Sequence, residues 1–226
     1  MSSNNPEVSI IIPVLNEADT IGITLDLLKG HFGDSYEIIV IDYGSTDGTI
    51  EISKRKKVIV IVNKEGGYVG AIKEGIKLST ANYIAWLDGD MTYDPLDIPK
   101  LLKPLKDNKA DVVIGRRFIS EIMLSDISFL TMLNNKMINF IFSMLFDFSL
   151  FDTISGFRAV RNTRDLIKYI KFSYDNDSDL VLLNAMLIKE GYRIKEVPIT
   201  FNPKYGKQKP ISFINGLKII IALLFF

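Results

Sequence analysis

The chain has 226 residues, enough for one domain with a substantial core, or for one domain with a short appendage. Its 27 basic and 27 acidic residues cancel, so no net charge attracts nucleic acid, and we expect no nucleic-acid partner. The chain has no cysteine, which excludes disulfides and thiolate metal sites. Its single histidine, His31, follows a predicted helix, so a metal site with several histidines is excluded as well. We therefore expect any metal ion to be held by oxygen ligands.

Strand-like runs rich in valine and isoleucine alternate with helical patterns in the first half. The predicted strands are Val8–Leu15, Tyr36–Asp42, Lys57–Val62, Tyr83–Asp88 and Asp111–Gly115, and helical patterns cover about 17–30, 47–56, 68–79 and 95–106. Near-continuous apolar strands joined by helices predict an α/β fold, with a mostly parallel sheet covered by helices on both faces.

In such sheets, ligands bind outside the carboxyl ends of the strands. Polar and acidic residues directly follow three of the predicted strands: Asn16 and Glu17, Asp42, and Asp88 and Asp90. We therefore expect these side chains along one edge of the sheet.

The second half contains an apolar helical stripe. It consists of Leu130, Leu133, Met137, Phe140, Ile141, Met144 and Leu145. The stripe faces either a core or a membrane or lipid groove, and both readings are open. Further on, we predict a helix over Asp179–Gly191 and a strand over Tyr192–Phe201.

The mean hydropathy of +0.19 is high, and part of the excess lies in the last residues. The closing run Ile219–Phe226 is shorter than the roughly 20 residues of a spanning helix, so it begins a membrane segment, lies at an interface or packs in a core. We predict a domain over residues 1–210 and an apolar tail over 211–226. The start, MSSNNPE, lacks signal-peptide features, which favours a cytosolic enzyme.

Asp88 and Asp90 flank Gly89 in the stretch YIAWLDGDMTYDP. A plain solvated turn is one reading, since aspartate and glycine favour turns. The other is a cation site, because residues two apart in an extended segment point the same way. Mg²⁺ and Mn²⁺ bind through one or two carboxylates together with substrate phosphates. A cation site here therefore predicts that the substrate carries a nucleotide diphosphate.

Other polar groups extend this site. Asn16 and Glu17 suit a helix N-terminus and can also contact a ligand, while Asp42 is placed to hydrogen-bond a base or ribose. Arg116 and Arg117 end a strand, and alternation sends one of them to the site, where it can bind a phosphate. A later loop adds three cations, Lys204, Lys207 and Lys209, which are solvated or close over an anionic acceptor.

An ordered set of motifs resembles the family-2 glycosyltransferases with the GT-A fold. The motifs are SIIIPVLNEADTI, EIIVIDYGSTDGT, WLDGDMTYDP, DVVIGRRF, DTISGFRAV and GYRIKEVPITF, and the resemblance runs from about Val8 to Gly216. It is strongest to the polyprenyl-phosphate sugar transferase branch, typified by dolichol-phosphate mannose synthases.

The resemblance implies roles for individual residues. Nucleotide-binding positions are Pro13, Leu15, Glu17, Asp42, Asp88, Gly89 and Asp90, with Asp88 and Asp90 as ligands of Mg²⁺ or Mn²⁺. The catalytic set is Asp90, Arg117, Asp152, Lys204 and Lys209, and Arg158 belongs with Asp152 to an element that shapes the site behind the sugar. In the family, the arginine that Arg117 matches contacts phosphate at the acceptor side. The late motif that aligns with KYGKQK closes on the phosphates of donor and acceptor.

Three residues depart from the family pattern. Tyr43 stands where the family has a second aspartate, Lys204 replaces an arginine, and Gln208 replaces a serine. Tyr43 bears on the donor contacts, whereas Lys204 keeps the charge of arginine but loses its bidentate fork.

The expected function is a metal-dependent, inverting transfer of a hexose from a sugar nucleotide, foremost mannose from GDP-mannose, to polyprenyl or dolichyl phosphate. The expected location is the cytoplasmic face of a membrane, on its surface or anchored by the C-terminal segment. One alternative uses UDP-glucose or another donor with another lipid or a saccharide acceptor, for which Asp152 is the first candidate base. Another is a nucleotide-binding module without turnover.

Overall fold

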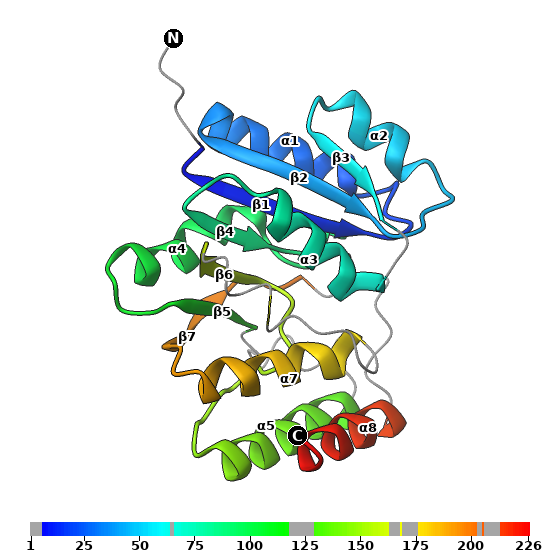
Figure 1. Cartoon of the computed structure of the whole chain (residues 1–226). Coiled ribbons are helices and arrows are strands. Elements are labelled where there is room, and N and C mark those ends of the chain that lie inside the picture. The colour runs from blue at the N-terminus through cyan, green and yellow to red at the C-terminus, as the bar shows by residue number, and fades with distance from the viewer. Residues whose placement is uncertain are drawn as a thin grey trace.

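The computed structural model describes residues 6–63, 66–117, 129–162, 168, 176–202, 205 and 213–226. Its centre is a seven-stranded sheet with the order β3-β2-β1-β4-β6-β5-β7 (Figure 1). The strands are β1 (Val8–Val14), β2 (Tyr36–Asp42), β3 (Ile59–Val62), β4 (Tyr83–Trp86), β5 (Val112–Arg117), β6 (Arg158–Arg161) and β7 (Ile194–Ile199). The predicted mostly parallel α/β sheet is confirmed.

The exception to parallel pairing is β6, which runs antiparallel to both β4 and β5. Sequence patterning missed this strand, because its four residues, RAVR, contain no apolar run and gain their extended form from two neighbouring strands. The strand brings the preceding residues, 152–157, back across the middle of the sheet.

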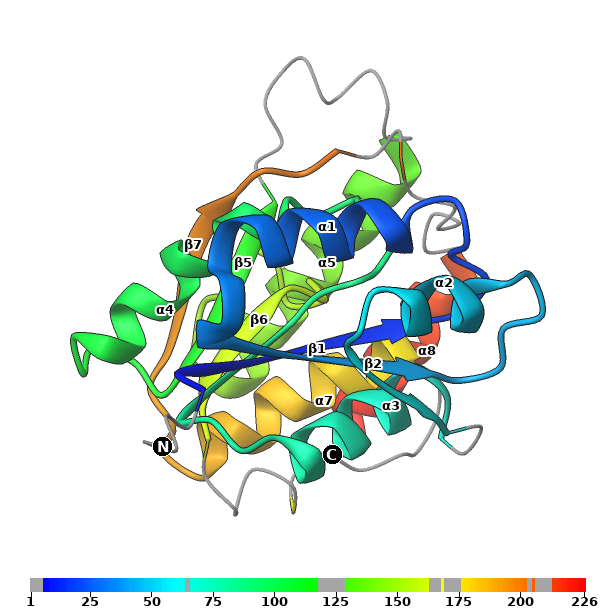
Figure 2. The ribbon, with the colours of Figure 1, turned by 90° about the horizontal axis from the view of Figure 1, so that it is seen from above.

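Helices cover both faces of the sheet (Figure 2). They are α1 (Ile21–Phe32), α2 (Thr49–Arg55), α3 (Gly67–Leu78), α4 (Ile98–Lys106), α5 (Phe129–Phe146), α7 (Asn176–Lys189) and α8 (Phe213–Leu224), with the short 3-10 helices η1 (Gly33–Ser35) and η2 (Pro95–Asp97). One core cluster joins the sheet to α1 and α4, and the other joins it to α3, α5, α7 and α8. Helix α4 buries Ile98, Leu101, Leu102 and Leu105, the spacing of one apolar helix face.

Helix α1 begins four residues later than predicted, at Ile21, and includes His31 in its last turn. The prediction that His31 follows the helix is therefore wrong. Asn16 has a φ of 58°, in the left-handed region, and the backbone there turns toward the neighbouring loop before the helix can start. Thr20 is the N-cap, so the expected capping role of Asn16 is also wrong.

The apolar stripe of α5 divides between two environments. Met137 and Ile141 pack against the core, whereas four members are exposed: Leu133 by 49%, Phe140 by 67%, Met144 by 66% and Leu145 by 38%. The core-facing reading is therefore wrong for these four residues. The fully buried positions of α5 include Asn134, Ile138 and Phe142, which the predicted stripe did not contain.

Helix α8 packs beside α5 and α7, and Figure 1 shows it next to α5 beyond α7. Ile219, Ile220, Ala222 and Leu223 of α8 are buried in the core cluster. Within the described residues, no helix is both long and apolar enough to cross a membrane. The division of the chain at residues 210 and 211 stays a prediction.

Candidate active site

The carboxyl ends of β1, β2 and β4 meet at one edge of the sheet, because these three strands are parallel neighbours. Burial is the main reason that the pKa of Tyr43 is raised far above its ordinary value, and Asp88, Glu17, Asp42 and Asp90 raise it further in that order. All four carboxylates are close enough to the phenol to act on it electrostatically, which agrees with the strand-end placement predicted for them.

The loops that follow β1 and β2 are tied together. Asn16 donates its backbone N–H to Ser45 Oγ at 2.8 Å, and its Oδ1 accepts the backbone N–H of Thr46 at 2.8 Å. Ala18 donates its backbone N–H to Asp47 Oδ2 at 3.0 Å. The polar residues of both loops therefore act mainly on each other and set the shape of the strand ends.

Pro13 and Leu15 lie on either side of the end of β1. Pro13 is buried inside the strand, opposite Ile41 of β2, whereas Leu15 is exposed. A side chain built at Gly44 would lie 3.7 Å from Leu15 Cδ1, so Leu15 covers the turn after β2. Their predicted contact with a nucleotide stays a prediction.

Asp42 is fully buried at the end of β2. Its Oδ1 accepts the backbone N–H groups of Gly44 at 3.0 Å and Ser45 at 2.9 Å. Its Oδ2 is buried without a hydrogen-bond partner among the described residues. Since an unmade hydrogen bond of a buried polar atom is costly, this oxygen is suited to a donor group of a ligand.

Asp88 and Asp90 are only 7% and 2% exposed, so the reading of D-G-D as a solvated turn is wrong. Asp90 Oδ1 accepts the backbone N–H of Thr92 at 2.9 Å and also its hydroxyl group. Gly89 is required because a Cβ there would lie 2.8 Å from Val14 Cγ1 of β1. The turn therefore packs tightly onto the sheet with its carboxylates at the strand ends.

Among the described residues there is no group of three or more histidine, cysteine, aspartate or glutamate side chains that could hold a metal ion. Asp88 and Asp90 offer hard oxygen donors, which suit Mg²⁺ or Mn²⁺ when phosphate and water complete the coordination. The residues fit an ion that arrives with a diphosphate, rather than an ion held by protein alone.

Two tyrosines that sequence reasoning missed lie at Asp88. A Cβ at Gly156 would be 2.7 Å from the Tyr68 hydroxyl and 3.5 Å from each oxygen of Asp88. The Tyr93 hydroxyl accepts the backbone N–H of Gly156 at 3.1 Å, and burial raises the pKa of Tyr93 to about 12. The only sequence signal for Tyr93 as a site residue is its closeness to the D-G-D turn, and no sequence pattern identifies Tyr68 as one.

Arg117 and Asp152 form a bidentate ion pair near the end of β5. Arg117 donates from Nε to Asp152 Oδ2 at 2.7 Å and from Nη2 to Oδ1 at 2.6 Å. Burial lowers the pKa of Arg117, but Asp152 and Tyr93 more than offset this, and the pKa is raised. The Arg117 guanidinium, predicted to bind a phosphate, thus binds the Asp152 carboxylate in this structure. The two residues are 35 positions apart in the sequence.

Arg158 holds the segment between Asp152 and β6. It is fully buried, and its guanidinium donates to Ser155 O at 2.9 Å, Thr153 O at 3.0 Å and Asn184 Oδ1 at 2.8 Å. Burial lowers its pKa to about 10. Its contacts are structural, and they position Asp152 and Gly156. Lys204 and Lys209, together with Lys207 and Gln208, lie outside the described residues.

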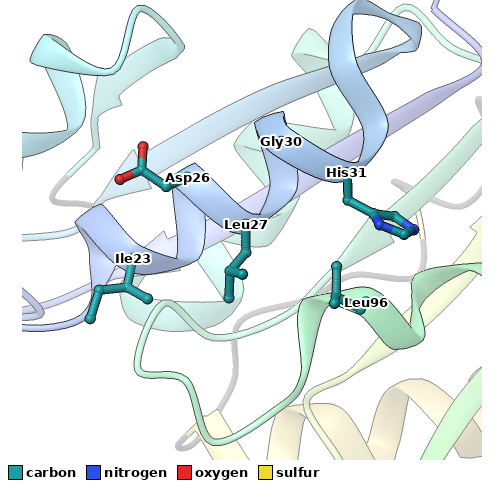
Figure 3. A pocket seen from close by; sticks show the side chains of 6 residues that line it. All are labelled: Ile23, Asp26, Leu27, Gly30, His31 and Leu96. Atoms are coloured by element: carbon teal, nitrogen blue, oxygen red, sulfur yellow. The ribbon is translucent and has the colours of Figure 1, made fainter.

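A separate surface pocket of about 440 Å³ lies between α1 and η2 (Figure 3). It is lined by Ile23, Asp26, Leu27, Gly30, His31 and Leu96. None of the acidic residues that follow the strands lines it. The strand ends therefore remain the place where the predicted site residues gather.

An uncharacterized protein and two glycosyltransferases are similar in sequence to this chain. An uncharacterized protein of Methanocaldococcus jannaschii is 32% identical over 98% of this chain and 92% of its own length. Glycosyltransferase AglJ of Haloferax volcanii is 31% identical over 87% of this chain and 63% of its own length. The low-salt glycan biosynthesis hexosyltransferase Agl6 of Haloferax volcanii is 28% identical over 97% of this chain and 53% of its own length. This chain thus spans less than two thirds of the two Haloferax proteins.

Among solved structures, glucosyl-3-phosphoglycerate synthase from Mycobacterium tuberculosis in complex with phosphoglyceric acid has a TM-score of 0.74 and 20% identity, over 97% of this chain and 79% of that chain. The same enzyme with Mn²⁺, uridine diphosphate and phosphoglyceric acid has a TM-score of 0.72 over 97% of this chain and 78% of that chain. At such identity the likeness shows the fold. The family model for glycosyl transferase family 2 matches residues 9–167, and the chain therefore belongs to glycosyl transferase family 2, with its GT-A fold.

Proposed function

We propose that this glycosyltransferase binds a sugar nucleotide with Mg²⁺ or Mn²⁺ at the strand ends and transfers a hexose, with inversion, to a polyprenyl or dolichyl phosphate. The observation that carries the proposal is the gathering of Asp42, Asp88 and Asp90, all buried, at the carboxyl ends of β2 and β4. Buried carboxylates at this edge suit a nucleoside on one side and a cation with its diphosphate on the other.

Asp42 orients the nucleoside in this proposal. Its Oδ1 is held by two backbone N–H groups, so its orientation is set before a ligand arrives. Its Oδ2 accepts a hydrogen bond from the base or the ribose. Asp88 and Asp90 hold the cation, which when bound stabilises the charge of the departing diphosphate.

A lipid phosphate is already anionic, so its oxygen can attack the anomeric carbon without a strong base. The new carbon–oxygen bond forms as the bond from that carbon to the nucleoside diphosphate breaks, and one displacement inverts the configuration. The chain then has to hold the two reactants in line, which can contribute roughly 7–11 kcal/mol in favourable cases. In the proposal, the bidentate Arg117–Asp152 pair helps to hold the reactants in this alignment.

A lipid acceptor is supported by the apolar face, which we define as the exposed large apolar residues of α5 and α8 together with Phe225. These are Leu133, Phe140, Met144 and Leu145 of α5, with Leu217, Ile221 and Leu224 of α8 and Phe225 just after it. Large exposed apolar patches mark binding or membrane surfaces. In the proposal, this face rests on the cytoplasmic surface of a membrane that contains the acceptor.

Two donors are tested together. GDP-mannose follows from the resemblance to dolichol-phosphate mannose synthases. UDP-glucose is the second candidate, because a structural neighbour is described in complex with Mn²⁺, UDP-glucose and phosphoglyceric acid.

The experiment measures transfer from labelled GDP- and UDP-sugars to short polyprenyl phosphates and to phosphoglyceric acid, with Mg²⁺, with Mn²⁺ and with EDTA. We expect one labelled lipid product that disappears with EDTA. A product on phosphoglyceric acid alone would contradict the lipid acceptor. Tight nucleotide binding without any transfer would support a binding module instead.

A further inference from the structure

Glu196 lies in β7, and both oxygens of its carboxylate bind the backbone of one short segment between α5 and β6. Its Oε2 accepts the backbone N–H of Phe151 at 2.8 Å, and its Oε1 accepts the backbone N–H of Asp152 at 2.7 Å. A carboxylate that binds two successive N–H groups fixes both the position and the direction of the backbone that carries them.

Asp152 is the residue whose orientation this contact affects. Its carboxylate binds Arg117 through Nε and Nη2, and its Oδ2 also accepts the backbone N–H of Arg117 at 3.1 Å. The side chain of Asp152 is therefore held by Arg117 of β5, while its main chain is held by Glu196 of β7. Two neighbouring strands thus act on one aspartate from different directions.

Helix α5 holds the same segment on either side of Asp152. Asn139 donates from Nδ2 to Phe151 O at 2.5 Å, and its Oδ1 accepts the Thr153 hydroxyl at 2.8 Å. Asn139 thus binds the two residues beside Asp152, whereas Glu196 binds the backbone of Asp152 itself.

The charge of Glu196 is kept at this place against an electrostatic cost. Burial is the main reason that its pKa is raised; the two N–H groups lower the pKa, and the nearby Asp152 carboxylate raises it. A raised pKa means that the ionised carboxylate is less favourable in the folded than in the unfolded chain. The use of both oxygens by the backbone gives the carboxylate a role despite this cost.

We propose that Glu196 is a positioning residue for sugar transfer, because its hold on the Phe151 and Asp152 N–H groups keeps the Asp152 carboxylate where it orients the Arg117 guanidinium. This inference rests on the proposed function for the step that it affects. Glu196 acts through Asp152 on Arg117, so its loss slows transfer. Nucleotide binding is spared, since Asp42 lies at the end of another strand, β2.

The substitution Glu196→Gln removes one of the two acceptors and keeps the size of the side chain. A glutamine has one oxygen and one NH₂ group, so its NH₂ faces one of the two backbone N–H groups and the segment has to shift. A misplacement of about 1 Å in a reacting site can lower the rate by about 100-fold.

The control is Glu37→Gln near the amino end of β2. Glu37 is also half-buried, and its Oε2 accepts the Ser9 hydroxyl at 2.5 Å and the backbone N–H of Thr80 at 3.2 Å. The two substitutions therefore remove the same kind of acceptor, but only Glu196 contacts the segment that carries Asp152.

The kinetic test uses the labelled donors and short polyprenyl phosphates named above, with Mn²⁺. We expect kcat to fall by at least about tenfold for Glu196→Gln and to stay unchanged for Glu37→Gln. Titration calorimetry with UDP and with GDP is expected to give the wild-type dissociation constants for both variants. Equal kcat values for the two variants, or loss of nucleotide binding by Glu196→Gln, would overturn the inference.

A second readout follows Arg117 directly and needs no turnover. In protein labelled with ¹⁵N-arginine, the Nε–H signal that is absent from Arg117→Lys belongs to Arg117. We expect Glu196→Gln to shift or broaden this signal and to leave that of Arg193, which pairs with Asp111, unchanged. An unchanged Arg117 signal would show that Glu196 does not position the pair.

These readouts separate the inference from the proposed function. If the wild-type chain transfers sugar to none of the acceptors, the proposed function fails, and the Arg117 signal still decides whether Glu196 positions the pair. Glu196→Asp, which keeps the charge on a shorter side chain, replaces Glu196→Gln if thermal unfolding shows that the latter is not folded. If neither variant folds, Glu196 is required by the fold itself and the inference is wrong.

Discussion

At Asp90, replacement by asparagine removes the negative charge and keeps an oxygen for the two donors of Thr92. Removing groups that merely orient metal ligands typically costs roughly 10- to 100-fold, so we expect metal-dependent transfer by Asp90→Asn to fall by at least about 100-fold. Single-turnover transfer assays and Mn²⁺ titration measure this. Asp107→Asn, on an exposed surface turn, is the control. An unchanged rate for Asp90→Asn would contradict the metal assignment.

The close contact of Gly89 with β1 can be tested through the free energy of unfolding of a variant. A Cβ there meets Val14 Cγ1 at 2.8 Å, so Gly89→Ala forces overpacking, and we expect the free energy of unfolding to fall by about 1–3 kcal/mol. Gly30→Ala in α1 is the control, since a Cβ there has no neighbour within 4 Å among the described residues. Alanine favours helix over glycine, so this control is expected to gain roughly 0.5–1 kcal/mol. Urea unfolding compares the two, and an equal gain would disprove the close contact.

At the scale of elements, β5 is joined to the segment before β6 by the Arg117–Asp152 pair. Asp152→Asn leaves a largely buried guanidinium without its charge partner, and such a loss typically costs about 3–5 kcal/mol. Asp111→Asn is the matched control, because Asp111 forms a similar bidentate pair with Arg193 that is more exposed than the Arg117–Asp152 pair. We expect urea unfolding to show a much smaller loss for the control. Equal losses would mean that burial of the first pair adds nothing.

The antiparallel strand β6 illustrates how the elements depend on one another. Its residues Arg158–Arg161 lack an apolar run, and they become a strand only between β4 and β5. The buried Arg158 then fixes the segment that carries Asp152 and Gly156. A local pattern does not contain this information, because the partners lie far away in the chain.

At the scale of the whole molecule, the apolar face of α5 and α8 lies on the opposite side of the sheet from α1. We expect Phe140→Ser combined with Met144→Ser to reduce co-sedimentation with vesicles of anionic phospholipid and polyprenyl phosphate by about tenfold, because two large apolar contacts are lost. Ile23→Ser on α1 removes a similarly exposed apolar residue and is the control. Equal binding by all three proteins would exclude this face as the membrane contact.

Most of the sheet and helix order was predictable, because apolar periodicity and strand-end polarity are local properties of the sequence. The burial of Asp88 and Asp90 was not, since it depends on the close contact of Gly89 with β1. The α5 stripe was ambiguous for a similar reason: apolar residues occupy more than one face of that helix, and only its packing against α8 and the core cluster selects Ile138 and Phe142 for the core.

The sequence by itself determined the alternating strands and helices, the edge at which Asp42, Asp88 and Asp90 lie and, through its ordered motifs, the family. The tertiary structure alone decided that Arg117 pairs with Asp152, that Tyr68 lies beside Asp88, and that the ring of Tyr43 meets the ring of Tyr68. The physical reason is that hydrophobic periodicity acts between near neighbours in the chain, whereas charge and burial act between groups that only folding brings together.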